Sequence, residues 1–173
     1  MAGKGEAVEM SMEPVRAERA VLSDIPELTA LRLFYLAEDL GEIAEADAAA
    51  IREALPRYFC AHLDRDLFAY VVRDGGRLAA CALLLVTEKP MSPRFLNGKT
   101  GTVLNVYTRP DCRRRGCGRA VMEKLLAEAA EMGLCTVELK ATDEGVPLYR
   151  AVGFTDSTSE YRLMRWRNPE RTK

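Results

Sequence analysis

The chain has 173 residues, of which 48% are apolar and 29% charged, a globular composition that excludes a wholly disordered chain. Its formal net charge of −1 gives no overall positive field to draw it onto nucleic acid or an anionic membrane. Any anion-binding function must therefore come from local clustering of positive charge.

The cysteine and histidine content argues against a metal centre. The five cysteines are scattered, no CxxC pair occurs, and His62 is the single histidine. We therefore expect no bound metal and a reducing, cytoplasmic setting. Residues 1–12 are polar, small and acidic, without the apolar core of a signal peptide, and no run approaches the roughly 18 apolar residues of a membrane span. We expect residues 1–12 and 169–173 to be tails around a single domain at 13–168.

The first elements in chain order are a short strand and two helices. The partly alternating segment Pro14–Ala20 predicts a strand. Ser23–Glu27 combines cap candidates with an early Pro and a Glu, which is typical of a helix start. A second helix is predicted for Asp47–Leu63, split or kinked at Pro56.

The middle of the chain has a β texture. The apolar runs Leu67–Val72 and Leu78–Thr87, joined by the turn Asp74–Gly76, predict a hairpin whose second strand is buried on both faces. Glu88–Lys99 contains two prolines and predicts a loop. Thr102–Thr108 is β-branched and aromatic, and predicts a third strand.

The last third alternates between helix and strand. An amphipathic helix is predicted to end near Met132, capped by Gly133, and a strand follows at Cys135–Lys140. Gly145–Val152 predicts a short helix, and Phe154–Trp166 one or two further strands. The order of elements indicates a mixed α/β fold.

A basic, glycine-containing segment lies between the third strand and the amphipathic helix. It reads Arg113-Arg114-Arg115-Gly116-Cys117-Gly118. Glycines allow close approach of backbone N–H groups, a helix N-terminus attracts anions, and arginines suit phosphate oxygens. These properties predict a phosphate-bearing ligand, with a solvated surface run as the alternative. A Walker A loop does not fit, because Arg119 follows Gly118, and a dinucleotide fingerprint would need a third glycine at position 121.

Two motifs in register carry a family resemblance. Arg113-x-x-Gly116-x-Gly118 follows the strand end Val106–Pro110, and Leu148-Tyr149 precedes Gly153-Phe154 downstream. Together with the elements between them they resemble the GNAT superfamily of N-acetyltransferases over roughly Pro14–Trp166. The resemblance implies an α/β fold: a mixed, strongly twisted sheet with helices on both faces and a splayed central pair of strands.

The resemblance also implies a binding site for acetyl-CoA as cosubstrate. Backbone groups of Val106, Tyr107 and Thr108 would pair with the pantetheine arm, and one N–H there would polarise the thioester carbonyl. Main-chain N–H groups in the next segment would surround the pyrophosphate; it comprises Arg113, Arg114, Arg115, Gly116, Cys117, Gly118, Arg119 and Ala120. One or two of the arginines at 114, 115 and 119 would reach the 3′-phosphate, and the sequence leaves open which.

Tyr149 is the implied general acid for the departing thiolate, with a packed aromatic residue as the alternative. The sequence departs from the family pattern nearby. Thr142 stands where the family often has Asn, and Gly145 where it often has Ala. Thr142 can still donate and accept a hydrogen bond, so it remains a candidate binding residue.

No general base is identified. The place where many members carry an acid on the central strand holds Asn105, which cannot act as a base. The acidic stretch Glu38–Glu42 either binds a cationic amine or is a solvated loop. An acetyl-cysteine intermediate at Cys112 or Cys117 is disfavoured, because the family generally uses direct transfer.

We expect an acyltransferase that moves acetyl from acetyl-CoA to a primary amine of a small molecule or peptide in a ternary complex. One alternative is a non-catalytic CoA-binding or sensing module on the same fold. Another is a nucleotide or nucleic-acid binder using Arg113–Arg115, which the balanced charge disfavours. We expect neither nucleic acid nor membrane as a partner. The acceptor and the oligomeric state are left open, although homodimers are common among such enzymes.

Overall fold

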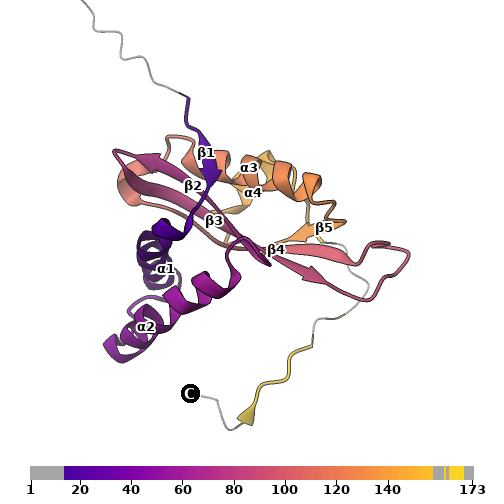
Figure 1. Ribbon diagram of the computed structural model, residues 1–173, viewed down its shortest axis with the longest axis horizontal. Coiled ribbons are helices and arrows are strands. Elements are labelled where there is room, and N and C mark those ends of the chain that lie inside the picture. The colour runs from indigo at the N-terminus through magenta and orange to yellow at the C-terminus, as the bar shows by residue number, and fades with distance from the viewer. Residues whose placement is uncertain (1–13, 158–161, 163, 170–173) are drawn as a thin grey trace, which may run out of the picture.

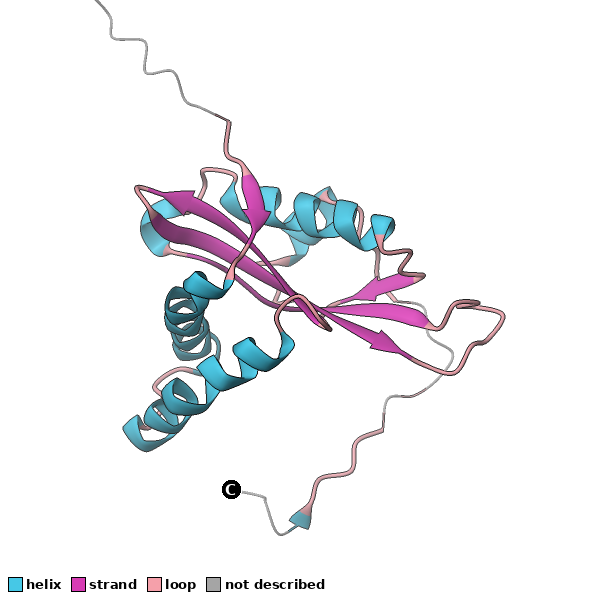
Figure 2. Ribbon diagram, viewed as in Figure 1, coloured by secondary structure: helices cyan, strands magenta, loops and turns pink. Residues whose placement is uncertain are grey.

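A computed structural model describes residues 14–157, 162 and 164–169, in which one twisted sheet separates two pairs of helices (Figures 1 and 2). The strands lie in the order β1-β2-β3-β4-β5. They span Ala17–Arg19, Leu67–Asp74, Arg77–Glu88, Lys99–Thr108 and Thr136–Glu138. The first four strands are antiparallel to their neighbours and β5 is parallel to β4, which gives the mixed sheet that the sequence predicts.

The helices cover both faces of this sheet. The helices α1 (Ile25–Leu40) and α2 (Glu45–His62) lie on one side, and α3 (Cys117–Glu131) and α4 (Val146–Ala151) on the other (Figure 1). Short 3₁₀ turns at Leu22–Asp24 and Pro110–Cys112 precede α1 and α3. Pro56 lies inside α2 and does not divide it in two, because a proline removes only one N–H bond and the carbonyl that it leaves free belongs to the exposed Arg52.

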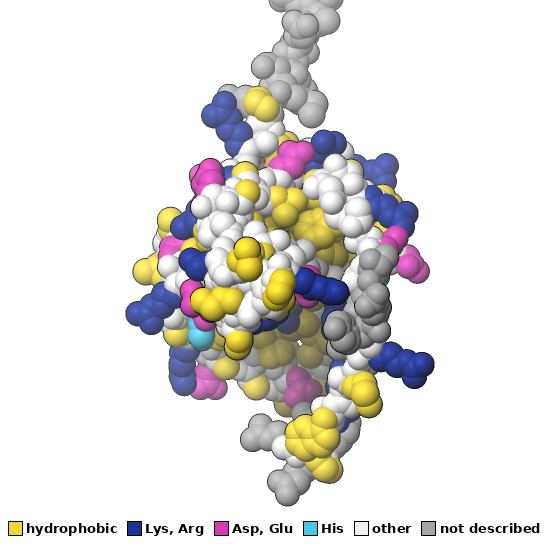
Figure 3. All heavy atoms as spheres, turned by 90° about the vertical axis from the view of Figure 1, so that its right-hand side faces the viewer, with side chains coloured by type: hydrophobic (Ala, Val, Ile, Leu, Met, Phe, Trp, Pro, Cys, Tyr) yellow, Lys and Arg dark blue, Asp and Glu magenta, His cyan; other side chains and the backbone are white. Residues whose placement is uncertain are grey.

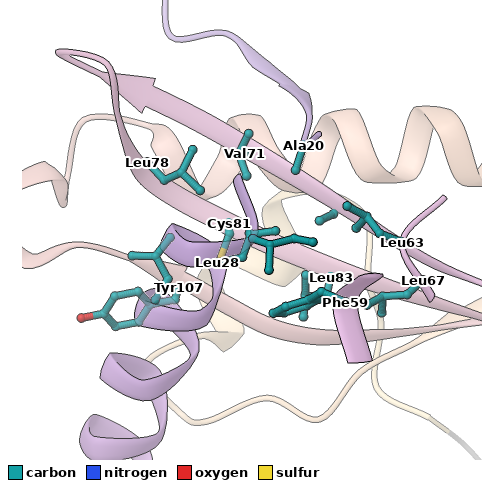
Figure 4. Packing of buried hydrophobic residues seen from close by; sticks show 13 residues of the cluster. Ala20, Leu28, Phe59, Leu63, Leu67, Val71, Leu78, Cys81, Leu83 and Tyr107 are labelled. Atoms are coloured by element: carbon teal, nitrogen blue, oxygen red, sulfur yellow. The ribbon is translucent and has the colours of Figure 1, made fainter. Parts of the chain in front are cut away.

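Each face of the sheet has its own core. On the α1–α2 side, Leu28, Phe59 and Leu83 are buried together (Figure 4). On the other side, Val121 and Leu125 of α3 pack against the opposite faces of β2 and β3. Because both faces are covered, β3 is buried over most of its length, as its apolar sequence predicts.

The sequence predicts strands in Phe154–Trp166, and this prediction is wrong for the part that the structure describes. Residues 158–161 and 163 lie outside the described residues, and the others in this range belong to no strand. The side chains of Met164 and Trp166 are 89% and 80% exposed. Their apolar, β-prone character satisfies the pattern, but a strand also needs a packed face, and these two side chains are exposed.

Gly101 of β4 pairs with Val137 of β5, and a substitution there tests how closely the sheet packs at this point. A Cβ at this buried position would lie 2.8 Å from Leu84 Cδ1 and 3.0 Å from Leu134 Cδ1. We expect Gly101→Ala to lower the free energy of unfolding by about 1–3 kcal/mol through overpacking, as measured by urea denaturation. Thr102→Ser, at the exposed neighbouring position, is the control, with an expected change within about 0.5 kcal/mol. An equal effect of both substitutions would contradict the packing described here.

Candidate active site

The last two strands of the described sheet, β4 and β5, are paired over only part of their length. The parallel pairing joins Thr100–Thr102 to Thr136–Glu138, whereas β4 continues to Thr108. Beyond Thr102, β4 therefore has no strand partner on that side within the described residues. An edge of this kind presents unpaired N–H and C=O groups to an extended ligand.

The end of β4 turns particular backbone groups toward this open edge. The N–H of Arg109 donates to Ala79 O of the β3 side at 2.9 Å. Because these groups alternate along an antiparallel strand, the backbone groups of Tyr107 face β3, and those of Val106 and Thr108 face the open edge. The Tyr107 side chain is buried with the α1–α2 core. Of the three residues predicted to bind the pantetheine arm, Val106 and Thr108 thus present backbone groups to the open edge, and Tyr107 does not.

The turn after β4 leads into the N-terminus of α3, where backbone N–H groups are left without helical partners. Gly116, the N-cap, has φ +84°, a left-handed conformation that favours glycine. The N–H of Ala120 bonds to Gly116 O at 2.9 Å, so the N–H groups of Cys117, Gly118 and Arg119 have no carbonyl four residues back in the helix. A Cβ at Gly118 would lie 3.4 Å from Leu148 Cδ2 and 3.5 Å from Thr108 Oγ1. The missing side chain therefore leaves the space between β4 and α4 free.

The arginines of this segment have different surroundings. Arg113 Nε donates to Thr108 O at 3.1 Å, and its Nη2 lies 2.7 Å from a carboxylate oxygen of Glu38 in α1. Arg115 pairs with Asp74 at the end of β2, with Nη1 and Oδ2 2.9 Å apart.

The other two arginines differ in whether they form an ion pair. Arg119 pairs along α3 with Glu123 at 2.7 Å. Arg114 forms no ion pair within the described chain and has φ +62°. Within the residues that the structure describes, its guanidinium therefore has no ion-pair partner beside this turn.

Helix α4 brings Tyr149 to the wall opposite β4. The main-chain carbonyl of Thr142 accepts hydrogen bonds from the N–H groups of Gly145 and Val146 at 2.9 and 3.1 Å, which fixes the start of the helix. A Cβ at Gly145 would lie only 2.8 Å from Tyr149 Cε2. Glycine at this place, where the family often has alanine, therefore leaves room for the ring. Tyr149 also packs edge-on against Phe154 at 6.1 Å between ring centroids.

These elements enclose a cleft of about 910 Å³. All the candidate site residues from the sequence line it except Arg115 and Ala120, namely Val106, Tyr107, Thr108, Arg113, Arg114, Gly116, Cys117, Gly118, Arg119, Thr142 and Tyr149. The side chain of Ala120 packs instead against the α3-side core. Tyr35, Glu144 and Leu148 also line the cleft and were not predicted as site residues. Tyr35 occupies an apolar stripe of α1, so its sequence position resembles that of a core residue.

The titratable groups of the cleft favour some chemistries over others. Burial, and to a lesser degree the nearby Tyr35, raise the pKa of Tyr149 above its ordinary value, so its hydroxyl is protonated at neutral pH. Burial also raises the pKa of the Cys112 and Cys117 thiols. Both thiols are therefore poor nucleophiles at neutral pH, in keeping with the expectation of direct transfer.

Other kinds of site find little support in the described part of the chain. There, no group of three His, Cys, Asp or Glu side chains is placed to hold a metal ion. No helix among the described residues is long and apolar enough to cross a membrane. On the face shown in Figure 3, basic and acidic side chains are interspersed rather than gathered in a basic band.

The parting of β4 from β5, with a helix N-terminus following β4, is the arrangement that the family resemblance implies. Residues 29–154 match the family model described as the Acetyltransferase (GNAT) family. The chain belongs to this family.

Named relatives agree with this assignment. The ribosomal protein bS18-alanine N-acetyltransferase of Escherichia coli (strain K12) is 35% identical over 92 residues, which cover 51% of this chain and 55% of the relative. The chain thus spans about half the length of the curated relatives it matches. A predicted acetyltransferase from Clostridium acetobutylicum, solved with acetyl-CoA, has a TM-score of 0.74 and 26% identity, covering 87% of this chain and 96% of its own. A GCN5-related N-acetyltransferase from Ralstonia eutropha JMP134 has a TM-score of 0.69 and 29% identity, covering 87% and 99%.

Gly118 offers a direct test of where acetyl-CoA binds. We expect Gly118→Val to abolish acetyl-CoA binding in a titration calorimeter, because its methyl groups would fill the space between Thr108 and Leu148. Thermal unfolding without ligand checks that the fold is retained, with Gly118→Ala as the control, since an added Cβ alone meets only ordinary contacts there. Unchanged affinity for acetyl-CoA would show that the ligand does not approach this turn.

Proposed function

We propose that the protein transfers the acetyl group of acetyl-CoA to a primary amine by direct attack in a ternary complex. The observation that carries this proposal is the meeting of three features in one cleft: the open edge of β4, the N-terminus of α3 and the hydroxyl of Tyr149. The first suits an extended amide-containing arm, the second a pyrophosphate, and the third a leaving group that needs a proton.

The two ends of acetyl-CoA have distinct partners in this proposal. Val106 and Thr108 would hold the pantetheine arm through their backbone groups, and the N–H groups of Cys117, Gly118 and Arg119 would hold the pyrophosphate. Arg114 is the arginine best placed for the 3′-phosphate, because it lines the cleft and forms no ion pair in the described structure. Arg115 is held by Asp74 outside the cleft.

In the chemical step the amine nitrogen attacks the thioester carbonyl carbon, and the carbon–sulfur bond breaks. The departing thiolate takes the proton of the Tyr149 hydroxyl, and the amide product loses its extra proton to solvent or to a base. A raised pKa keeps Tyr149 protonated, and therefore able to donate, throughout the neutral and mildly alkaline range.

Acidic side chains of α1 lie at the same cleft and suit a cationic acceptor. Asp39 and Glu144 line it together with Tyr35, whose hydroxyl lies 3.5 Å from an Asp39 carboxylate oxygen. The Glu38 carboxylate, in contrast, is already paired with Arg113. Opposite charge at the mouth of a cleft raises the local concentration of an amine substrate. An acceptor with a free amine is therefore the substrate class that this electrostatic arrangement favours.

Release of free thiol from acetyl-CoA in the presence of an amine tests the proposal. The panel of acceptors should include aminoglycosides, polyamines, amino acids, a lysine peptide and a peptide with N-terminal alanine, the last because the Escherichia coli relative is named an alanine N-acetyltransferase. Amine-dependent thiol release with any of them supports the proposal. Binding of acetyl-CoA without turnover across the whole panel would favour the non-catalytic module.

Tyr149→Phe tests the proton donor. The substitution keeps the ring and its packing against Phe154, so acetyl-CoA binding should change little, while kcat should fall about 10²-fold. The kcat and the KM for acetyl-CoA can both be measured with an acceptor found in the panel. An unchanged kcat, with chemistry rate-limiting, would reduce Tyr149 to a packing residue.

The alkaline side of the pH profile gives an independent check. The active form of Tyr149 is protonated, so its contribution to the rate is lost only as the pH rises through its pKa, which lies above the ordinary value of 10.0. We expect no fall in kcat from this group between about pH 7 and 9. A decline in kcat over that range that Tyr149→Phe abolishes would contradict the raised pKa.

The arginine assignment can be tested with matched variants. Arg114→Gln should weaken acetyl-CoA binding about tenfold, because a charge-assisted bond to the 3′-phosphate is lost. Arg115→Gln, which removes a guanidinium held by Asp74, should change affinity less than twofold. With the dephospho form of acetyl-CoA the Arg114 variant should match the parent. A larger loss for Arg115→Gln than for Arg114→Gln would reverse the assignment.

A further inference from the structure

Asn105 interrupts the regular pairing of β4 with β3. Leu104 pairs with Leu83 and Tyr107 with Cys81, so two residues of β4, Asn105 and Val106, stand opposite one residue of β3. This two-against-one arrangement is a β-bulge. Asn105 has φ +51°, in the left-handed region that asparagine enters more readily than most residues with a side chain.

The bulge changes which backbone groups of β4 face the β5 side. Before it, the odd-numbered Lys99 presents its carbonyl to that side and accepts from Cys135 N at 3.0 Å. After it, the odd-numbered Arg109 donates instead to Ala79 O on the β3 side. In a strand without the bulge, the N–H of Val106 would therefore point into the β3 ladder and not into the cleft.

The side chains of β4 show the same change of direction after the bulge. Val103 belongs to the α3-side core, whereas Tyr107, four residues further along the same strand, belongs to the α1–α2 core. In a regular strand, residues separated by four positions share one face. After the bulge at Asn105, the backbone groups of β4 thus point to the opposite edge, and its side chains to the opposite face, from those they would have in a regular strand.

The side chain of Asn105 is held from two elements. It is 6% exposed, and its Oδ1 accepts a hydrogen bond from Arg32 Nη1 of α1 at 3.2 Å. Its Nδ2 donates to Cys81 Sγ of β3 at 3.4 Å. The Arg32 guanidinium also lies over the Tyr35 ring at 5.3 Å, so the same helix that carries acidic groups of the cleft also holds the bulge.

We propose that Asn105 is a positioning residue, which holds β4 in the bulged form that turns the Val106 N–H toward the thioester carbonyl, and that Arg32 fixes its side chain from α1. The catalytic part of this inference rests on the proposed function. The other part, that the Val106 N–H recognises the carbonyl of acetyl-CoA, can be tested by binding measurements alone.

The binding test compares acetyl-CoA with S-ethyl-CoA, a thioether that lacks the carbonyl oxygen. The parent should bind acetyl-CoA about two- to tenfold more tightly than S-ethyl-CoA, the range expected for one hydrogen bond. Asn105→Ala should reduce this preference to about one, because alanine disfavours the left-handed conformation. Asn105→Gly should keep most of the preference, since glycine adopts positive φ freely.

Arg32→Met and Leu104→Ala complete the set. Arg32→Met removes the donor to Asn105 while keeping most of the apolar stem, and should give a preference between those of the parent and Asn105→Ala. Leu104→Ala truncates the half-exposed neighbouring side chain of the same strand and should leave the preference unchanged. If Asn105→Ala fails to fold, the preference for acetyl-CoA over S-ethyl-CoA can still be compared between the parent, Asn105→Gly and Arg32→Met.

The outcomes separate this proposal from the proposed function. A preference that is lost in Asn105→Ala supports the positioning role even where no amine supports turnover. With an acceptor, kcat of Asn105→Ala should also fall about 10²-fold with little change in acetyl-CoA KM, as on loss of an oxyanion donor. The positioning role is overturned if the parent shows no preference, if Asn105→Ala keeps it, or if Asn105→Gly loses as much as Asn105→Ala.

Discussion

The parting of β4 from β5 is the constraint on which the rest of the site depends. Their parallel pairing ends at Thr102 and Glu138, although β4 continues for six more residues to Thr108. A sheet that stayed paired would satisfy its own hydrogen bonds and leave nothing for a ligand. Because the two strands part, a backbone edge of β4 lies open on its β5 side, between two packed cores.

The remaining elements are arranged around this open edge. Helix α3 begins where β4 ends, so its N-terminal N–H groups lie beside the last residues of the strand. Helix α4 forms the opposite wall, and the absence of a side chain at Gly145 lets the Tyr149 ring lie against it. Helix α1 contributes Arg32 to the bulge and Glu38 to the ion pair with Arg113. Helices α1, α3 and α4 thus each contribute both to a core and to the cleft.

The sequence predicts those parts of the molecule whose chemistry is local. The Gly116–Gly118 turn, the amphipathic stripe of α3 and the apolar β3 strand are each encoded by a short run of residues, and the structure has all three elements. The motif spacing also indicated the family, because two signatures in register constrain the elements between them. The acceptor is different, since fold does not fix substrate within a large superfamily.

Features that depend on distant partners could not be predicted in the same way. Three consecutive arginines look equivalent in sequence, and only the fold shows that Arg115 pairs with Asp74 while Arg114 lines the cleft. Asn105 looks like a polar interruption in a β-branched strand, and its role becomes visible only with the register of β3. The described residues near Trp166 follow a β-prone pattern but belong to no strand, because strand formation depends on packing that a local pattern does not encode.

Amide hydrogen exchange, followed by NMR residue by residue with and without saturating acetyl-CoA, tests the central claim most directly. The open edge should become paired, so exchange should slow at the N–H groups of Val106 and Thr108. Exchange at Tyr107, whose N–H faces β3, should change much less. Unchanged exchange at Val106 and Thr108, with slowing instead around the separate hollow lined by Leu126 and Phe154, would contradict the account.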